Sequence, residues 1–185
     1  MGFASLLTGI KGVLGFLQAL PLQVSFWLTY AWIGEGIQGR NNVFVVTGFG
    51  EWVCVSLIVS ALSTPVLLTL EALTCRFLGK VEPGVIPIRS LSFARVWLKN
   101  LLVEASGRWI SGTLFWPVWL RAAGMQIGRD CEISTIIDVV PELVSIGEHV
   151  FFADGIYLGT PKMHRGQVLH RRLSISGNTF LGNHS

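Results

Sequence analysis

Three stretches near the carboxy-terminal end, IGRDCEIST (127–135), IGEHVFFADGIYLG (146–159) and ISGNTFLG (175–182), share one spacing. A large apolar residue recurs in them at every sixth position: Ile127 and Ile133, then Ile146, Phe152 and Leu158, then Ile175 and Leu181. Each is followed by Gly, Ala or Ser. Neither a helix of period 3.6 nor a strand of period 2 produces this spacing. The pattern predicts a left-handed parallel β-helix of hexapeptide repeats, with the apolar residue inside a triangular coil and the small residue at its corner.

A second inward-facing position is predicted four residues after six of these apolar positions, Leu158 excepted: Cys131, Ile137, Val150, Ile156, Thr179 and Ser185. One coil takes about three hexapeptides, and a stable stack needs about three coils. The regular segments make fewer. We therefore expect residues 124–185 to form an incomplete β-helix, so that the chain is a fragment or another polypeptide covers the open end.

The composition indicates that much of the rest faces lipid. Hydrophobic residues make up 51% of the chain and charged residues 14%, with a mean hydropathy of +0.57. The formal net charge of +3 is too small to indicate nucleic-acid binding. Two uncharged segments, 12–34 and 52–70, have the length of a membrane-spanning helix. A cleaved signal peptide does not fit the first segment, because its apolar core is too long.

The distribution of cations predicts the orientation of these two segments. Lys11 precedes the first, and a group of basic residues follows the second: Arg76, Lys80, Arg89, Arg95 and Lys99. By the positive-inside rule, both termini of an integral membrane hairpin (residues 1–80) are then cytoplasmic, and the loop with Arg40 faces the other side. Glu71 at the end of the second segment is expected to snorkel to the interface.

Residues 81–123 are expected to form a helical connector. The first element is a helix over 89–105, with one apolar face bordered by Arg95 and Lys99. Such a helix either lies in the lipid headgroups or packs against the following domain. The stretch 109–120 holds three tryptophans and is too short to span, so we interpret it as an interfacial or re-entrant element.

Several motifs occur in a fixed order along the chain: Glu82-Pro83-Gly84, Gly112-Thr113, Trp119 to Gly124, Ile127 to Thr135, Ile146-Gly147-Glu148, Phe152 to Gly155, His164-Arg165-Gly166 and Leu181 to His184. Together they resemble the membrane-bound carboxy-terminal region of poly-lysine-synthetase-like nonribosomal peptide synthetases. The resemblance implies membrane helices followed by a soluble, trimeric, hexapeptide-type domain similar to acyl-transferring units. It also implies membrane lipid and a carrier protein, or the rest of a synthetase, as partners, and other copies of the chain.

The implied activity is transfer of an acyl or aminoacyl group from a thioester to an amine or hydroxyl. In hexapeptide acyltransferases a histidine in a loop that leaves the coil is the general base, and His164 lies in the interruption 160–172 where such a loop belongs. Arg165, with Arg171 or Arg172, is expected to hold the phosphates of coenzyme A or of a carrier's phosphopantetheine arm, neither of which is a permanent cofactor. Asp154 is expected to orient the acceptor amine or the histidine.

Other sites have less support. His164 and His170 lie six residues apart with no third ligand at metal spacing, so no metal site is predicted. Asp138 and Glu142 are expected to lie in a solvated outward loop. Two further functions stay open: a non-catalytic membrane anchor or assembly element of a synthetase, and a small polytopic membrane protein in which the six-residue period is coincidental.

Overall fold

The computed structural model describes residues 2–38, 49–159 and 161–183. The chain divides into two compact units, Met1–Leu67 and Leu68–Ser185. The boundary falls inside a long helix, so that its first part belongs to one unit and its last turns belong to the other. The expected boundaries at residues 80 and 123 stay predictions.

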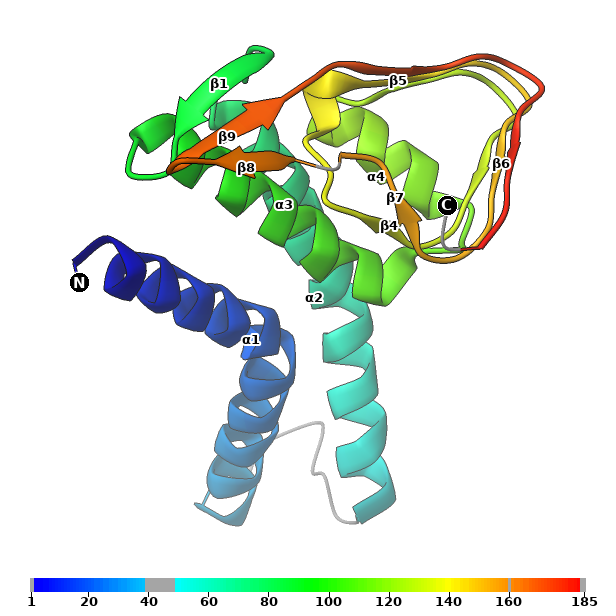
Figure 1. The fold of residues 1–185 in the computed structure, drawn as a ribbon. Helices are drawn as coiled ribbons and strands as arrows, with labels where there is room; N and C mark the ends of the chain where they lie inside the picture. Colours follow the sequence, from blue (N-terminus) through cyan, green and yellow to red (C-terminus); the bar gives the residue numbers. More distant parts are fainter. Residues whose placement is uncertain (1, 39–48, 160, 184–185) are drawn as a thin grey trace. The chain divides into compact units, whose positions relative to one another are not determined.

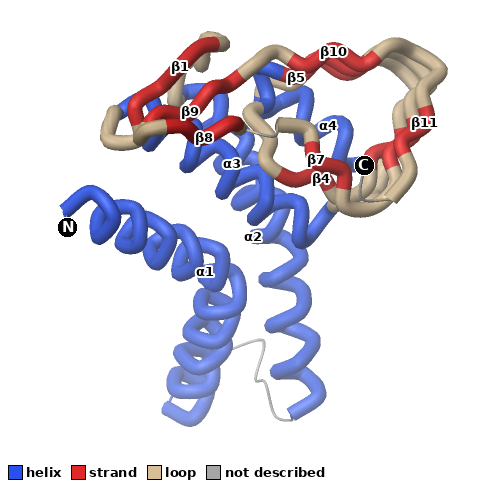
Figure 2. The backbone as a smooth tube through the Cα atoms, viewed as in Figure 1, coloured by secondary structure: helices blue, strands red, loops and turns tan. Residues whose placement is uncertain are grey.

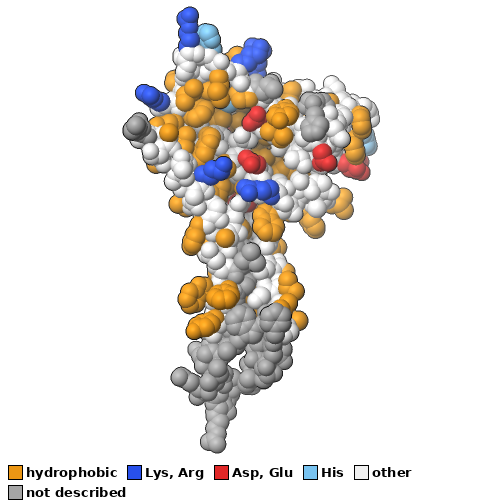
Figure 3. All heavy atoms as spheres, turned by 60° about the horizontal axis from the view of Figure 1, so that its bottom comes forward, with side chains coloured by type: hydrophobic (Ala, Val, Ile, Leu, Met, Phe, Trp, Pro, Cys, Tyr) orange, Lys and Arg blue, Asp and Glu red, His pale blue; other side chains and the backbone are white. Residues whose placement is uncertain are grey.

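The amino-terminal part is helical. Helix α1 covers Gly2–Gln38 and helix α2 covers Phe49–Phe77 (Figure 1), so both uncharged segments lie in helices. Two windows, Gly2–Leu20 and Val53–Phe77, are long and apolar enough to cross a membrane. Large apolar side chains of α2 are exposed, among them Leu57 at 64% and Leu62 at 69%. Hydrophobic side chains are also visible on the surface in Figure 3. The loop with Arg40 lies outside the described residues.

Two helices follow in the second unit. Helix α3 runs from Leu91 to Ile110, two residues later at its start and five at its end than predicted. Ser90 caps its start, because the Ser90 side chain accepts a hydrogen bond from the backbone N–H of Phe93 at 3.1 Å. Helix α4 covers Phe115–Ala123 and ends at Gly124, which takes a left-handed conformation. Of the two positions considered for this helix, packing against the following domain is favoured over the lipid headgroups. Leu101, Leu102 and neighbouring side chains of α3 are buried.

The tryptophan-rich stretch 109–120 does not form one re-entrant element. Trp109 belongs to α3 and is exposed, whereas Trp116 and Trp119 belong to α4 and are buried. The two buried rings stack with centroids 5.3 Å apart. Their indole N–H groups donate to backbone carbonyls, Trp116 to Ser134 at 3.1 Å and Trp119 to Leu68 at 2.8 Å. Buried indoles need such acceptors, so the tryptophans join α4 to the strands and to α2.

The chain after α4 forms short strands that stack in three parallel sheets (Figure 2). The first sheet contains β2 (Gln126–Ile127), β5 (Val144–Ile146) and β10 (Leu173–Ile175). The second contains β3 (Glu132–Ile133), β6 (Phe151–Phe152) and β11 (Phe180–Leu181). The third pairs β4 (Ile136–Ile137) with β7 (Ile156–Tyr157). A 3₁₀ turn, η1 (Pro141–Leu143), leads into β5.

The pairing register links the residues that the six-residue period singled out. Ile127 and Ile175 pair with Ile146 on either side, and Ile133 and Leu181 pair with Phe152. We propose on this basis that the three sheets are the faces of a left-handed β-helix. Glycine is required at position 147, because a Cβ there would lie 2.8 Å from the Cα of Gly177 in the next turn of the chain.

Within the interruption expected at 160–172, residues 162–170 form a β-hairpin. Strands β8 (Lys162–His164) and β9 (Gln167–His170) pair antiparallel around Arg165 and Gly166. These two residues have φ of 46° and 76°, as a two-residue hairpin turn requires. Strand β1 (Gly84–Pro87) pairs with the other edge of β9, which places the connector beside the hairpin.

A largely buried ion pair joins three segments of this unit. Lys99 of α3 is 2% exposed and bonds Glu142 of η1, and its Nζ also donates to the carbonyl of Gly79 at 2.6 Å. The same Glu142 oxygen accepts from the backbone N–H of Val81 at 2.8 Å. Lys99 therefore does not border a lipid-facing surface, and Glu142 is not a solvated loop residue. Their opposite charges compensate for burial.

Glu71 is also buried instead of snorkelling. Its side chain is 4% exposed and accepts a hydrogen bond from the Ser106 hydroxyl at 2.6 Å. Because Ser106 lies in α3, this bond fixes the last turns of α2 against α3 within the second unit. The prediction that Glu71 snorkels to the membrane interface was wrong, because the Ser106 hydroxyl provides a polar partner for it inside the protein.

Phe152 should contribute far more to stability than its neighbour Phe151. Phe152 is 1% exposed and Phe151 is 41% exposed. Phe152→Ala should lower the free energy of unfolding by about 3–5 kcal/mol through the cavity that it leaves. Phe151→Ala is the matched control and should cost about 1 kcal/mol through its stacking on Phe180. Denaturant titration of the detergent-solubilised chain, followed by tryptophan fluorescence, measures both; similar losses would contradict the interior position of Phe152.

The buried ion pair should reveal itself in a double-mutant cycle. Lys99→Met leaves Glu142 charged and buried without its cation, so the free energy of unfolding should fall by about 3–5 kcal/mol. Adding Glu142→Gln should recover part of this loss, because the uncompensated charge is removed. Additive losses in the same denaturant titration would mean that the two side chains do not interact.

Candidate functional site

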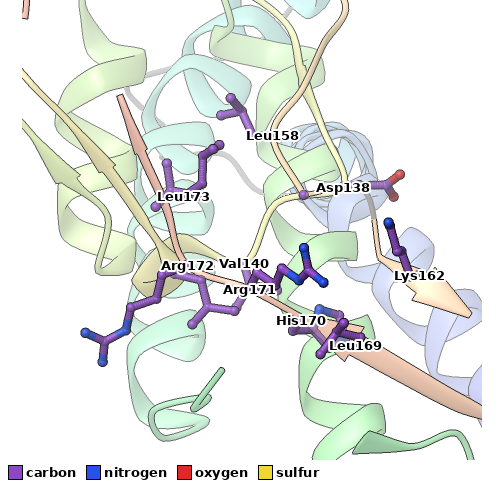
Figure 4. A pocket seen from close by; sticks show the side chains of 12 residues that line it. Asp138, Val140, Leu158, Lys162, Leu169, His170, Arg171, Arg172 and Leu173 are labelled. Carbon is purple, nitrogen blue, oxygen red and sulfur yellow. The ribbon is translucent and has the colours of Figure 1, made fainter. Parts of the chain in front are cut away.

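A pocket of about 220 Å³ lies where the β8–β9 hairpin meets the stacked sheets. The apolar part of its lining comes from β5, β9, β10, η1 and the residues next to η1 and β7: Val140, Leu143, Val144, Leu158, Leu169 and Leu173. Polar side chains complete the lining: Asp138, Lys162, His170, Arg171 and Arg172 (Figure 4). A concave apolar site with a few convergent charged groups is the usual form of a small-molecule site.

The charged side chains that line this pocket carry a net positive charge and include one carboxylate. Lys162, Arg171 and Arg172 line the pocket together with a single carboxylate, Asp138. Figure 4 shows Lys162 and Arg171 pointing toward the same side as Asp138, whereas Arg172 points away. Asp138 is held in place by its backbone at φ 57° and by Asn100, whose Nδ2 donates to Asp138 Oδ1 at 3.3 Å. The arrangement favours a ligand with an anionic group.

His170 is the buried titratable group of the pocket. Its side chain is 8% exposed, and its Nε2 is buried with no hydrogen-bond partner among the described residues. Burial lowers the pKa of His170 below the ordinary value of 6.5, because desolvation penalises the imidazolium. Burial therefore favours the neutral imidazole, with Nε2 enclosed by the protein.

His164 and Arg165 lie on the exposed part of the hairpin. His164 is the last residue of β8, and Arg165 is the first turn residue. Neither lines the pocket. Lys162 and His164 are two residues apart in one strand, so their side chains share a face and are about 7 Å apart along it. In the hairpin, His164 is thus the next residue after the pocket residue Lys162 on the same face of the strand.

Asp154 is at a different corner, between β6 and β7. Its carboxylate accepts hydrogen bonds from the hydroxyls of Ser134 and Thr135, the latter at 3.2 Å. Its backbone N–H donates to Asn183 Oδ1 at 3.1 Å. Of the five side chains predicted from the sequence, the pocket collects Arg171 and Arg172, while His164, Arg165 and Asp154 lie outside its lining.

Sequence reasoning missed Asp138, Lys162 and His170 as members of one site. Their convergence depends on the hairpin, which folds back so that His170 pairs with Gly84 and Lys162 pairs with Leu169. The signal available in the sequence was the pair Arg165-Gly166 at the centre of 162–170, which is suited to a two-residue turn. Among the described residues, no three His, Cys, Asp or Glu side chains form a group that could hold a metal ion.

Comparison with known proteins yields one informative similarity. The chain is 30% identical over 109 residues to delta-poly-L-ornithine synthetase of Acinetobacter baumannii (strain AB307-0294). This similarity supports a relation to poly-amino-acid synthetases. The aligned part is 57% of this chain and only 8% of the synthetase. No protein-family model matches the chain, and no solved structure matches it.

The lowered pKa of His170 should make folding sensitive to acid. Between the ordinary value of 6.5 and the lower folded-state value, the unfolded chain binds a proton that the folded chain does not. The free energy of unfolding should therefore fall as pH drops through this window and level off below it. Denaturant titrations from pH 7.5 to about 5 should show this loss, and His170→Gln should remove it. His149→Gln, a change at an exposed corner, is the control that should retain it.

Proposed function

We propose that the chain is a membrane-tethered acyl- or aminoacyl-transferase module of a nonribosomal-peptide-synthetase-like protein. It joins a thioester-activated group to an amine or hydroxyl near the cytoplasmic membrane face. The observation that carries the proposal is the basic pocket beside the hairpin, with His164 on the same strand face as the pocket residue Lys162. The similarity to a poly-ornithine synthetase supports the synthetase setting.

His164 is the general base of this reaction. Its imidazole takes a proton from the acceptor as the acceptor nitrogen or oxygen attacks the thioester carbonyl carbon. The carbon–sulfur bond then breaks, and the leaving thiolate takes the proton from the imidazolium to become a thiol. The exposure of His164 leaves room for a donor to approach the hairpin.

The donor is coenzyme A or the phosphopantetheine arm of a carrier protein. Arg165 follows His164 directly and binds a phosphate of this donor, with Arg172 as the second cation that points out of the pocket. Asp154 orients the acceptor amine or the histidine, and its Oδ1 accepts hydrogen bonds from the hydroxyls of Ser134 and Thr135.

The membrane tether consists of α1 and α2. We propose that both cross the bilayer with the two termini in the cytoplasm, supported by Lys11 just before the uncharged segment 12–34 and by the basic residues that follow segment 52–70. The partners are membrane lipid, a carrier protein or the rest of a synthetase, and further copies of the chain in a trimer-like assembly.

A non-catalytic anchor or assembly element is the second candidate function. The observation that favours it is the separation of His164 and Asp154 from the pocket, since neither lines it. An anchor needs only the apolar helices and the stacked sheets. The two functions differ in whether His164 affects transfer.

Replacement of His164 should separate these functions. His164→Ala should lower transfer from an aminoacyl thioester by about a hundredfold or more, with membrane insertion unchanged. Arg165→Gln should instead raise the KM for the donor, because a lost phosphate contact weakens ground and transition state alike. His149→Ala is the matched control, an exposed histidine at a corner of the stacked sheets. Transfer assays in membranes from cells that express each variant measure the effects. Wild-type transfer by His164→Ala would favour the anchor function.

A further inference from the structure

A group of large apolar side chains is exposed where α3 turns into α4. Its members are Trp109 at 57%, Leu114 at 89%, Phe115 at 71% and Val118 at 58%, and we call these four residues the α3–α4 corner. The outward positions of a helix that packs on a protein core are normally polar in water. Apolar side chains that gather on a surface in this way mark contact with another molecule or with a membrane.

The exposed side of α4 is fixed by what the helix buries on its other side. Trp116, Trp119 and Leu120 are buried, and the two indoles donate to backbone carbonyls of other elements. Rotating α4 to cover Phe115 and Val118 would expose the tryptophans and break these bonds. Cover for the corner must therefore come from outside the described residues.

Two hydrogen bonds fix the direction of α3 relative to the end of α2. Lys99 Nζ donates to the carbonyl of Gly79 at 2.6 Å, and the Ser106 hydroxyl donates to Glu71 at 2.6 Å. Residue numbers thus rise along α3 while they fall along α2, so the two helices are antiparallel. The end of α3, where the corner begins, points back along α2 toward its apolar part.

The contact of α4 with α2 gives the level of the corner. Trp119 donates to the carbonyl of Leu68 at 2.8 Å, inside the window Val53–Phe77 that is long and apolar enough to cross a membrane. About 20 residues cross the hydrocarbon core, so a span that begins at Val53 ends close to Glu71, the first charge after the uncharged segment 52–70. Leu68 lies about 4.5 Å before Glu71 along the helix axis. The corner is therefore level with the end of the span, where acyl chains meet headgroups.

We propose that the α3–α4 corner inserts into the lipid surface beside the end of the membrane span in α2. The inference rests on the proposed membrane tether. Trp109 and Phe115 have aromatic rings, and Trp in particular is enriched at this level of a bilayer because its ring is apolar and its N–H is polar. Leu114 and Val118 add apolar area, whose removal from water is favourable.

A second contact with the membrane changes what the tether does. A domain that is joined to a bilayer by one helix can turn about the axis of that helix. The corner gives the second unit another point of attachment at the same level, so that one side of the unit always faces the lipid. The β8–β9 hairpin and its pocket then stay at a fixed height above the membrane.

Photocross-linking in membranes of cells that express the whole chain tests the proposal. p-Benzoylphenylalanine, which bonds to nearby C–H groups when illuminated, replaces Phe115 or Val118. Val85 is the matched control, because it has the same exposure as Val118, 58%, but lies in β1, far from the corner (Figure 1). Mass spectrometry of the purified chain should show phospholipid adducts at positions 115 and 118 with a yield at least about fivefold above that at position 85.

The same experiment identifies any other occupant of the corner. Covalent pairs of the chain in place of lipid adducts would mean that a second copy covers the corner, and adducts to another protein would mean a protein partner. Either result overturns the proposal. Equal lipid yields at positions 85 and 118 would overturn it too, since the corner would then have no preference for lipid over a strand on the far side.

An alkaline carbonate wash of the same membranes separates the corner from the tether. A chain that stays in the membrane but gives no lipid adducts at positions 115 and 118 would keep the tether and overturn the corner assignment. A chain that the wash releases, but that gave lipid adducts at both positions before the wash, would overturn the tether and keep the lipid contact of the corner.

Discussion

The buried Lys99–Glu142 pair is the constraint on which the second unit depends. One oxygen of Glu142 takes both the Lys99 ammonium group and the backbone N–H of Val81, and the same ammonium group bonds the carbonyl of Gly79. Each of these groups would be costly to bury alone. Together they fix the segment after α2, the middle of α3 and the turn before β5 in one arrangement. Strand β1 begins only a few residues after Val81, so its position follows from the same contacts.

From β1 the constraint extends to the candidate site. A two-stranded hairpin is marginal by itself in water, and a third strand with an apolar face stabilises it. β1 provides this strand, with Val168 of β9 buried and Ile86 of β1 in an apolar cluster with Val140 and Leu143. The hairpin in turn holds Lys162 and His170 at the rim of the pocket. The pocket is thus assembled by residues that are distant in sequence and joined by backbone pairing.

The parts that sequence reasoning predicted are those with local or repeated signals. Ile146 and Phe152 could be placed because one residue in six repeats, and two apolar helices could be placed because length and composition suffice. The burial of Lys99 and Glu71 could not be predicted, because it depends on a charged or hydroxyl partner in another element. The position of His170 could not be predicted either. It follows from the pairing of β1 with β9, and no sequence periodicity indicates that pairing.

The hairpin inserted between β7 and β10 provides side chains that the closely packed stack of strands has no room for. The corners of the stack tolerate little change: Gly147 and Gly177 already approach so closely that a methyl group does not fit. Side chains for recognition must therefore come from an excursion, and this one returns in register, because β10 still pairs with β5. The excursion is tied to β1, and β1 is tied through Val81 and Glu142 to the end of α2. The residues between α2 and β1, and then the pairing of β1 with β9 and of β9 with β8, therefore connect the end of α2 to His170 and Lys162.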